Sequence, residues 1–342
     1  MHSNETSSNP PTIKPVPEGI QRPLWSVMIP TYNCATYLRE TLASVLAQDL
    51  GSDVMQIMVI DDHSNDNPEA VVEELGKGRV EFYRQPQNVG MTHNFQTSLE
   101  KSRGHLVHQL HGDDVARSGF YQKMQQVFEQ HPEIGAAFCR TIIMDDNGHW
   151  QWITGQELDE TGVLPKDWIE KLAGLNRIMT PSMVVRRDVY EKLGGFNHSF
   201  QTTSEDWEMW VRIAANYAIG HEVEPLALYR QRSTSNMHSN VTNGRHAKQM
   251  YRAVTLFESY LVDRVPATVY AQAKQNSAFF ALQGADFCMR EGTPSSAIAQ
   301  IKLALEYKPS FRVIRSALRI FLWTGTLRMI RSLIKNPLKK SD

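Results

Sequence analysis

The chain has 342 residues, of which 41% are hydrophobic and 21% charged, and this composition excludes a wholly disordered or fibrous protein. The 36 Lys and Arg residues nearly balance the 37 Asp and Glu residues, so we expect no nucleic-acid partner. The three cysteines lie far apart without a CxxC spacing, which disfavours a disulfide framework or a zinc site and favours a cytoplasmic location. No uncharged apolar run reaches the length of a membrane span.

Three regions follow one another along the chain. Residues 1–21 are rich in Pro, Ser and Asn and are predicted to form a flexible arm. Residues 22–245 alternate short apolar runs with helical patterns, which predicts an α/β domain with a mainly parallel sheet flanked by helices. Residues 246–342 show only helical patterns. The small residues within 267–308 recur at helical spacing, which suggests a tetratricopeptide-like helix pair. The predicted strands are Trp25–Ile29 (stopped by Pro30), Met55–Ile60, Val80–Tyr83, His105–Leu110, Gly135–Met144, Thr180–Val185 and Leu226–Arg230.

Polar side chains follow three of these strands where each strand ends, and ligands of open α/β sheets bind at that edge. The residues are Tyr32, Asn33, Asp61, Asp62, Asp113 and Asp114. A carboxylate there can accept hydrogen bonds from a base or a ribose, and Tyr32 can flank a flat base. Two adjacent acids such as Asp113 and Asp114 favour a hard divalent cation that leaves room for phosphate oxygens. The alternative for both clusters is ordinary turn chemistry, since Asp and Asn are turn residues.

A third cluster begins a predicted helix, at Ser204-Glu205-Asp206-Trp207. Asp206 would be held at a cleft by a rigid helix with an aromatic residue beside it, which suits a general base that faces a sugar ring. The alternative is that an acid at a helix start simply complements the helix dipole.

The order and spacing of seven short segments resemble the inverting, family 2 glycosyltransferases with the GT-A fold. The resemblance covers residues 24–231. The segments are WSVMIPTYN, MVIDDHSND, QNVGMTHNF, HQLHGDDV, TPSMVVRRDVYEKLGGFN, SEDWEMWVRIA and EPLALYR.

The resemblance implies transfer of a sugar, with inversion, from a nucleotide-sugar donor, with a UDP-sugar favoured. Mn²⁺ or Mg²⁺ would be bound by Asp114 with Asp113, and Asp206 would be the catalytic base. Glu205 and Trp207 would lie on the acceptor side. The implied nucleotide and donor contacts are Pro30, Tyr32, Asn33, Asp61, Asp62, Asn88, Gly90, Asn94, Asp113, Arg230 and Arg232. The family context implies cell-surface polysaccharide or glycan biosynthesis in bacteria, with a glycan or lipid-linked acceptor.

The chain departs from the family pattern at three positions. His111 stands where an additional Asp is common, and His93 stands where the donor helix often carries an Arg. Arg232 replaces a His that some members place near the metal, so Arg230 or Arg232 could bind the diphosphate instead. His238, in the same loop, is a weak candidate ligand.

Other functions fit the residues less well. A sugar nucleotidyltransferase would need a Gly-rich loop after the first strand, where this chain has Pro30-Thr31-Tyr32-Asn33. A dehydrogenase would need GxGxxG after a strand. A non-catalytic interaction protein with an active helical tail is the alternative from another class, and the four acids Asp62, Asp113, Asp114 and Asp206 argue against it.

The tail is basic and amphipathic. Residues 311–342 contain eight Lys or Arg and one Asp, with an apolar stripe formed by Phe311, Ile314, Leu318 and Phe321 and a second one after Gly325. One interpretation is a helical cap whose stripe packs on the catalytic domain. The other is peripheral contact with the inner face of the cytoplasmic membrane. The sequence does not indicate an oligomeric state.

Overall fold

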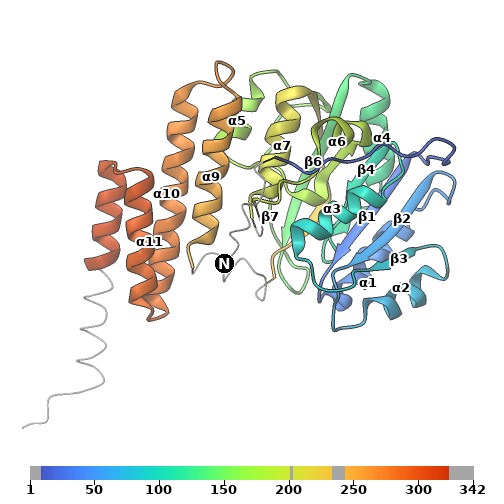
Figure 1. The fold of residues 1–342 in the computed structure, drawn as a ribbon, viewed down its shortest axis with the longest axis horizontal. Coiled ribbons are helices and arrows are strands. Elements are labelled where there is room, and N and C mark those ends of the chain that lie inside the picture. The colour runs from blue at the N-terminus through green and yellow to red at the C-terminus, as the bar shows by residue number, and fades with distance from the viewer. Residues whose placement is uncertain (1–8, 201–202, 233–242, 323–342) are drawn as a thin grey trace, which may run out of the picture. The chain divides into compact units, whose positions relative to one another are not determined.

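The computed structural model describes residues 9–200, 203–232 and 243–322. The chain divides into two compact units (Figure 1). The first consists of Met1–Leu172 with Asn176–Ser233, and the second of Ala173–Leu175 with Thr234–Asp342. Among the described residues, no helix is long and apolar enough to cross a membrane.

The first unit is built on a ten-stranded mixed sheet in the order β3-β2-β1-β4-β9-β6-β10-β5, with β7 paired to β6 and β8 to β10. Strands β3, β2, β1 and β4 run parallel, as do β6 and β10, whereas β9 is antiparallel to both of its neighbours. The strands are β1 Trp25–Thr31, β2 Met55–Asp61, β3 Glu81–Arg84, β4 Leu106–Gln109, β5 Val115–Ala116, β6 Ile134–Met144, β7 Trp150–Ile153, β8 Gly162–Val163, β9 Met183–Arg186 and β10 Ala218–Arg230.

Helices cover the sheet because its central strands are apolar on both faces. Val27 and Met28 point to opposite faces of β1, and both are fully buried. The core on the Val27 face includes residues of α1, α2 and α4. The helices of this unit are α1 Ala35–Leu46, α2 Pro68–Gly76, α3 Met91–Lys101, α4 Phe120–Gln130, α5 Trp168–Gly174, α6 Arg187–Leu193 and α7 Glu205–Asn216.

Two strands are longer than the sequence predicts. Pro30 does not stop β1, since it pairs with Ile60 of β2 and its carbonyl accepts a hydrogen bond from Gly112 at 3.0 Å. Proline lacks only the N–H, so its carbonyl still serves a neighbouring strand. Strand β10 begins at Ala218, eight residues before the predicted start, and its pairing with β6 is irregular between Glu222 and Ala227.

The predicted flexible arm is packed in part against the first unit, which corrects the expectation for residues 10–14. Ile13 is 1% exposed, and the Pro11 carbonyl accepts a hydrogen bond from the Gly195 N–H at 2.7 Å. A Cβ at Gly194 would lie 2.8 Å from the Pro11 carbonyl oxygen, so the glycine there makes room for this segment. One buried isoleucine and one backbone hydrogen bond are enough to fix a segment whose composition resembles a disordered arm.

The second unit is helical throughout its described part. It contains α9 Arg245–Tyr260, α10 Ala267–Arg290, α11 Pro294–Tyr307 and a helix at 311–322. Small residues line their contacts, including Ala278, Ala281 and Ala304, and a side chain at Gly284 would collide with Gln300. The helix pair that the sequence suggested is present as α10 and α11. Its first helix is too long for a tetratricopeptide repeat, because α10 alone has 24 residues and both helices of a repeat share about 34.

A pair of isoleucines tests the packing of the arm. We expect Ile13→Ala to lower the free energy of unfolding by about 2–4 kcal/mol, since it removes a buried side chain. Ile20→Ala, at a side chain that is 50% exposed, should change it by less than about 0.5 kcal/mol. Chemical denaturation of both variants makes the comparison. Equal and small effects would mean that the segment does not pack in solution.

Candidate functional site

The site lies at the end of β4, where hydrogen bonds to β1 continue past the strand. Leu110 and Gly112 donate to the Met28 and Pro30 carbonyls at 3.0 Å each. A Cβ at Gly112 would lie 2.6 Å from Thr31 Oγ1, so only glycine allows this approach. The ladder therefore fixes His111 and the acids after Gly112 against the carboxyl end of β1, as the sequence predicts.

His111, Asp113 and Asp114 form a compact set of oxygen and nitrogen donors. One donor atom from each lies within 4.8 Å of the others. Asp114 is 1% exposed, and burial together with the charge of Asp113 raises its pKa well above the ordinary value. Its Oδ1 accepts a hydrogen bond from the Arg230 N–H at 2.9 Å, whereas Oδ2 and His111 Nε2 are buried with no hydrogen-bond partner in the described structure. Buried polar atoms without partners are costly, so this set fits a cation that would bind them.

The two arginines proposed for the diphosphate differ in their surroundings. Arg230 is 4% exposed, and its guanidinium donates to the carbonyls of Asp113, Asp145 and Asp146 and pairs with Glu40. Four contacts within the protein therefore use most of its donor directions. Arg232 is more accessible and pairs with Asp113 at 2.9 Å, so it can exchange that partner for a phosphate. His238 lies outside the described residues.

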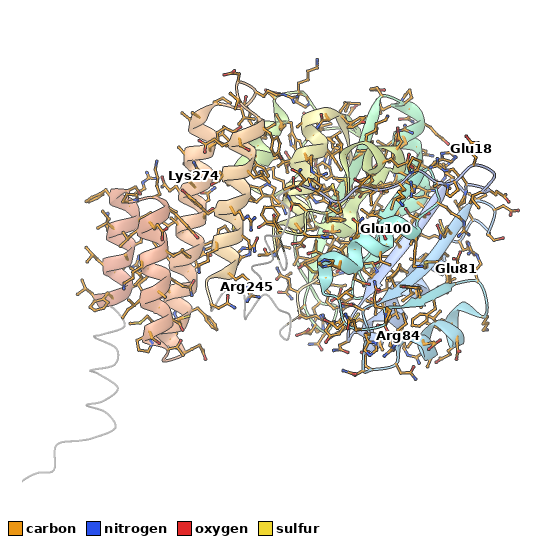
Figure 2. All side chains as sticks on the ribbon, in the orientation of Figure 1. Glu18, Glu81, Arg84, Glu100, Arg245 and Lys274 are labelled. Atoms are coloured by element: carbon orange, nitrogen blue, oxygen red, sulfur yellow. The ribbon has the colours of Figure 1, made fainter. Side chains whose placement is uncertain are left out.

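At the ends of β1 and β2, hydrogen bonds connect the polar residues to one another, and the neighbouring Tyr32 ring is exposed. Asp61 is buried and accepts hydrogen bonds from the N–H and hydroxyl of Ser64 and from Arg84, whose position at the edge of the unit Figure 2 shows. Asn33 accepts from the Asn65 N–H at 2.9 Å. Tyr32 is 45% exposed and available to flank a base. These residues therefore form the hydrogen bonds of an ordinary turn and also lie at the edge of the sheet where ligands bind.

Asp62 organises the loop that precedes α3. Its carboxylate accepts hydrogen bonds from the N–H groups of Val89 and Gly90 at 2.7 and 3.0 Å and from the Asn88 side chain at 3.0 Å. Gly90 has φ 86°, which favours glycine. Asn94 is buried and bridges the Ile60 carbonyl and Gln85, so its amide links α3 to β2. These side chains shape the predicted donor pocket, and most of their hydrogen-bonding capacity is satisfied within the protein.

The two acids at the start of α7 differ in accessibility. Glu205 is 6% exposed, and its Oε2 is buried with no hydrogen-bond partner among the described residues. Burial and the charge of Asp206 raise the pKa of Glu205 to about 8. Asp206 is half-buried and accepts hydrogen bonds from its neighbour's backbone N–H at 2.6 Å and from the Asn176 amide at 3.2 Å. Burial raises the pKa of Asp206, while these hydrogen bonds lower it.

Trp207 corrects one prediction. The sequence places it on the acceptor side, but it is 1% exposed and its indole N–H donates to the Leu172 carbonyl at 2.7 Å. The side chain of a residue one step along a helix points about 100° away, so Trp207 enters the core while Asp206 stays half-buried. Trp207 therefore anchors α7 and has no accessible face for a sugar.

Tyr229 brings the two acid clusters together, and the sequence reasoning missed this role. Its phenol lies close enough to Asp114, Asp113, Asp206 and Glu205 that burial and these charges raise its pKa. Tyr229 pairs with Ile143 of β6, which in turn pairs with Trp152 of β7. Paired residues point to the same face of a sheet, so Trp152, 49% exposed, lies about 10 Å along that face from Tyr229.

Comparisons of sequence identify related proteins. A glycosyltransferase of Haemophilus influenzae described as uncharacterized is 24% identical over 65% of this chain and 68% of its own length. The poly(ribitol-phosphate) beta-N-acetylglucosaminyltransferase TarP of Staphylococcus aureus is 38% identical, over 26% of this chain and 28% of its own length.

Solved structures share the fold. S. aureus TarS residues 1–349, in complex with UDP-GlcNAc, matches with a TM-score of 0.52 at 14% identity and covers 82% of this chain and 90% of that one. The mannosyltransferase PcManGT of Pyrobaculum calidifontis, in complex with GDP-Man and Mn²⁺, matches with a TM-score of 0.52 at 18% identity over 97% and 92%. The expected GT-A architecture, an α/β sheet followed by a helical region, is confirmed.

The family model described as Glycosyl transferase family 2 matches residues 26–194, which include the ends of β1, β2 and β4 and their acidic residues. On this match, residues 26–194 form a family 2 glycosyltransferase domain.

Proposed function

We propose that this chain transfers a sugar from a nucleoside diphosphate sugar to an acceptor hydroxyl, with inversion at the anomeric carbon. The observation that carries the proposal is the compact set of His111, Asp113 and Asp114 at the sheet edge, one donor atom of each lying within 4.8 Å of the others. A single displacement requires a leaving-group site and a base on opposite sides of one reacting carbon. In this proposal the set would hold the leaving group and Asp206 would be the base, and the charges of both clusters act on the buried phenol of Tyr229.

A divalent cation, Mn²⁺ or Mg²⁺, fits the donor set of His111, Asp113 and Asp114 because two buried atoms of that set have no hydrogen-bond partner within the described structure. When bound, such an ion neutralises charge on a diphosphate leaving group. One imidazole with two carboxylates favours Mn²⁺ over Mg²⁺, since magnesium prefers oxygen ligands alone. His111 is thus the additional ligand that the sequence left open.

Asp206 is the proposed general base. It would take the proton from the acceptor hydroxyl as that oxygen bonds to the anomeric carbon and the bond from this carbon to the diphosphate oxygen breaks. A pKa raised by burial brings a carboxylate closer to the pH at which it accepts protons efficiently. Glu205, whose pKa burial and the charge of Asp206 raise to about 8, is almost inaccessible, so it would stay protonated behind the base.

On the donor side, we propose that Tyr32 flanks the base and that Asp62 orders the loop of Asn88 and Gly90 around the nucleoside. Arg232 would leave Asp113 and bind the diphosphate, while Arg230 keeps the site assembled. A UDP-sugar is the first donor to test because TarS is solved with UDP-GlcNAc, and GDP-mannose is the second because PcManGT is solved with it.

On the acceptor side, the exposed Trp152 replaces Trp207 as the aromatic surface on the face of Tyr229. An indole offers a flat apolar area at which a sugar ring of a glycan can stack. The partial similarity to TarP favours an acceptor in cell-surface polysaccharide synthesis, such as a polyol phosphate chain or a lipid-linked glycan.

A donor panel tests the proposal. UDP-GlcNAc, UDP-glucose and GDP-mannose are each incubated with the full chain and Mn²⁺, Mg²⁺ or excess chelator, and nucleotide release is measured. We expect metal-dependent release from at least one donor, faster with Mn²⁺. With an acceptor identified, the linkage in the product should show inversion by NMR. Retention would contradict the single-displacement mechanism.

The first substitution tests the metal ligand. Asp114→Asn should abolish nucleotide release and weaken Mn²⁺ binding measured by electron paramagnetic resonance. The thermal midpoint should stay nearly unchanged or rise slightly, because Asn keeps the acceptor for the Arg230 N–H and removes one of two adjacent like charges. Asp188→Asn, an exposed acid paired with Lys192, is the control and should retain activity. Full activity of Asp114→Asn would refute the assignment.

The second substitution tests the base. We expect Asp206→Asn to lower kcat at least about 100-fold with donor affinity unchanged, as is usual when a general base is lost. Glu205→Gln should have a smaller effect because that side chain is nearly inaccessible. If Glu205→Gln proved the more damaging change, the base would be the preceding residue.

The pH dependence of stability tests the buried acid. Between the unfolded pKa of Glu205, about 4.5, and its folded pKa, about 8, the folded state holds a proton that the unfolded state has released. The stability of the folded state therefore falls as pH rises through this window. Glu205→Gln should remove that loss, so its thermal midpoint relative to wild type should increase from pH 5 to pH 8. Glu69→Gln, at an exposed acid in the first turn of α2, should show no such trend.

A further inference from the structure

The helix at 311–322 has two apolar faces, and only one of them packs within its unit. Val313 and Ala317 are 0% and 6% exposed and belong to the core that this helix shares with α9, α10 and α11. The stripe that the sequence analysis singled out lies elsewhere on the helix. The face that the sequence leads one to bury is therefore not the face that is buried.

The stripe of Phe311, Ile314, Leu318 and Phe321 is exposed, by 79%, 42%, 57% and 59% respectively. Its residues recur at intervals of three and four, so they form a continuous line along one side of the helix. Large apolar side chains scattered singly are normal on a surface, but four in a line mark an interaction site. Within its own unit, the stripe is therefore not part of the packed core.

A row of arginines adjoins the stripe. The row consists of three exposed residues, Arg312, Arg315 and Arg319. Since successive residues of a helix are about 100° apart, this row adjoins the stripe on the side away from Ala317. Within the described ranges, none of the three forms an ion pair. The sequence from 311 to 342 adds five more basic residues and a single acid.

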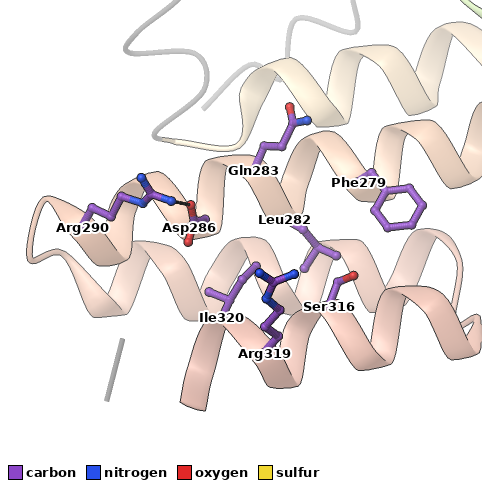
Figure 3. Close-up of a pocket in the computed structure, with 8 residues that line it drawn as sticks. All are labelled: Phe279, Leu282, Gln283, Asp286, Arg290, Ser316, Arg319 and Ile320. Atoms are coloured by element: carbon purple, nitrogen blue, oxygen red, sulfur yellow. Dashed lines mark ion pairs between the residues drawn. The ribbon is translucent and has the colours of Figure 1, made fainter. Parts of the chain in front are cut away.

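A pocket of about 520 Å³ lies on the other side of this row, between the helix and α10 (Figure 3). Arg319 and Ser316 line it from the helix. From α10, Arg290 contributes a charge that Asp286 neutralises at 2.7 Å, so Arg319 leaves the pocket with a net positive charge. A phosphate group can therefore reach Arg319 from solvent next to the apolar stripe.

We propose that this helix docks the protein on the surface of an anionic phospholipid bilayer. The stripe would lie in the interface between headgroups and acyl chains, and the arginines would contact lipid phosphates. An exposed apolar stripe edged by cations is the pattern of helices that lie in the membrane interface. A second copy of the chain fits less well, since antiparallel pairing of the stripes about a two-fold axis would bring two arginine rows together. The inference does not depend on the transfer reaction.

The experiment is vesicle co-sedimentation of the full-length chain. Vesicles of phosphatidylcholine alone are compared with vesicles containing about one-third phosphatidylglycerol, at low and high salt. We expect binding to the anionic vesicles, release at high salt, and little binding to the neutral ones. Leu318→Glu with Phe321→Glu should abolish binding, and Arg315→Glu with Arg319→Glu should weaken it by at least about fivefold per residue.

Matched controls lie on α11. Ile298→Glu replaces an apolar side chain that is 43% exposed, and Lys302→Glu reverses an exposed charge, so both should bind like wild type. Circular dichroism and thermal melting show that each variant is folded. Nucleotide release, where present, should be equal in all variants.

Three outcomes would overturn the proposal. The full-length chain could ignore anionic vesicles. The stripe variants could bind as well as wild type, which would assign binding to other residues such as those after 322. Light scattering could show a dimer that Leu318→Glu dissociates, which would make the stripe a subunit interface.

Discussion

The site depends on two buried side chains, Asp114 and Arg230, which lie where the ends of β4, β6 and β10 meet. Asp114 and Arg230 are 1% and 4% exposed, and the Arg230 N–H donates to Asp114. The Arg230 side chain binds the carbonyls of the Asp113 turn and of the turn after β6, and it reaches Glu40 on α1. A guanidinium this deeply buried is tolerated only when hydrogen bonds satisfy it, and these contacts do so. Arg230 therefore fixes the ends of β4, β6 and β10 in one arrangement, and the cation site follows from that arrangement.

Much of this architecture could be predicted because its signals are periodic. Continuous apolar runs locate β1 and β2, and acids at strand ends must meet at one edge of a parallel sheet. The prediction fails where a side chain's direction or partner decides its role. Trp207 and Asp206 are neighbours in sequence, yet the side chain of Trp207 is buried in the core and that of Asp206 is half-buried. Arg230 and Arg232 are two residues apart, yet only Arg232 has freedom to change partner.

The tail shows a second limit of periodic patterns. Phe311, Ile314, Leu318 and Phe321 give the strongest apolar stripe of the helix, but the smaller Val313 and Ala317 are the residues that are buried. The core of this unit is built from alanines on α10 and α11, whose close approach leaves no room for large side chains. The stripe is the more hydrophobic face, but only the smaller side chains of Val313 and Ala317 fit into the space beside these helices. The stripe is then left for a partner outside the described structure.

Carboxylates at this sheet edge separate into two classes by their hydrogen bonds. Asp61 and Asp62 are buried, but backbone N–H groups and neighbouring side chains satisfy both of their oxygens. Asp114 and Glu205 are equally buried, and each keeps one oxygen without a hydrogen-bond partner in the described part of the chain. The first class shapes the loops of the site, and the second has capacity left for something the folded chain does not supply. A buried oxygen without a hydrogen-bond partner costs free energy. This cost is the physical reason to place a cation at Asp114 and a proton on Glu205.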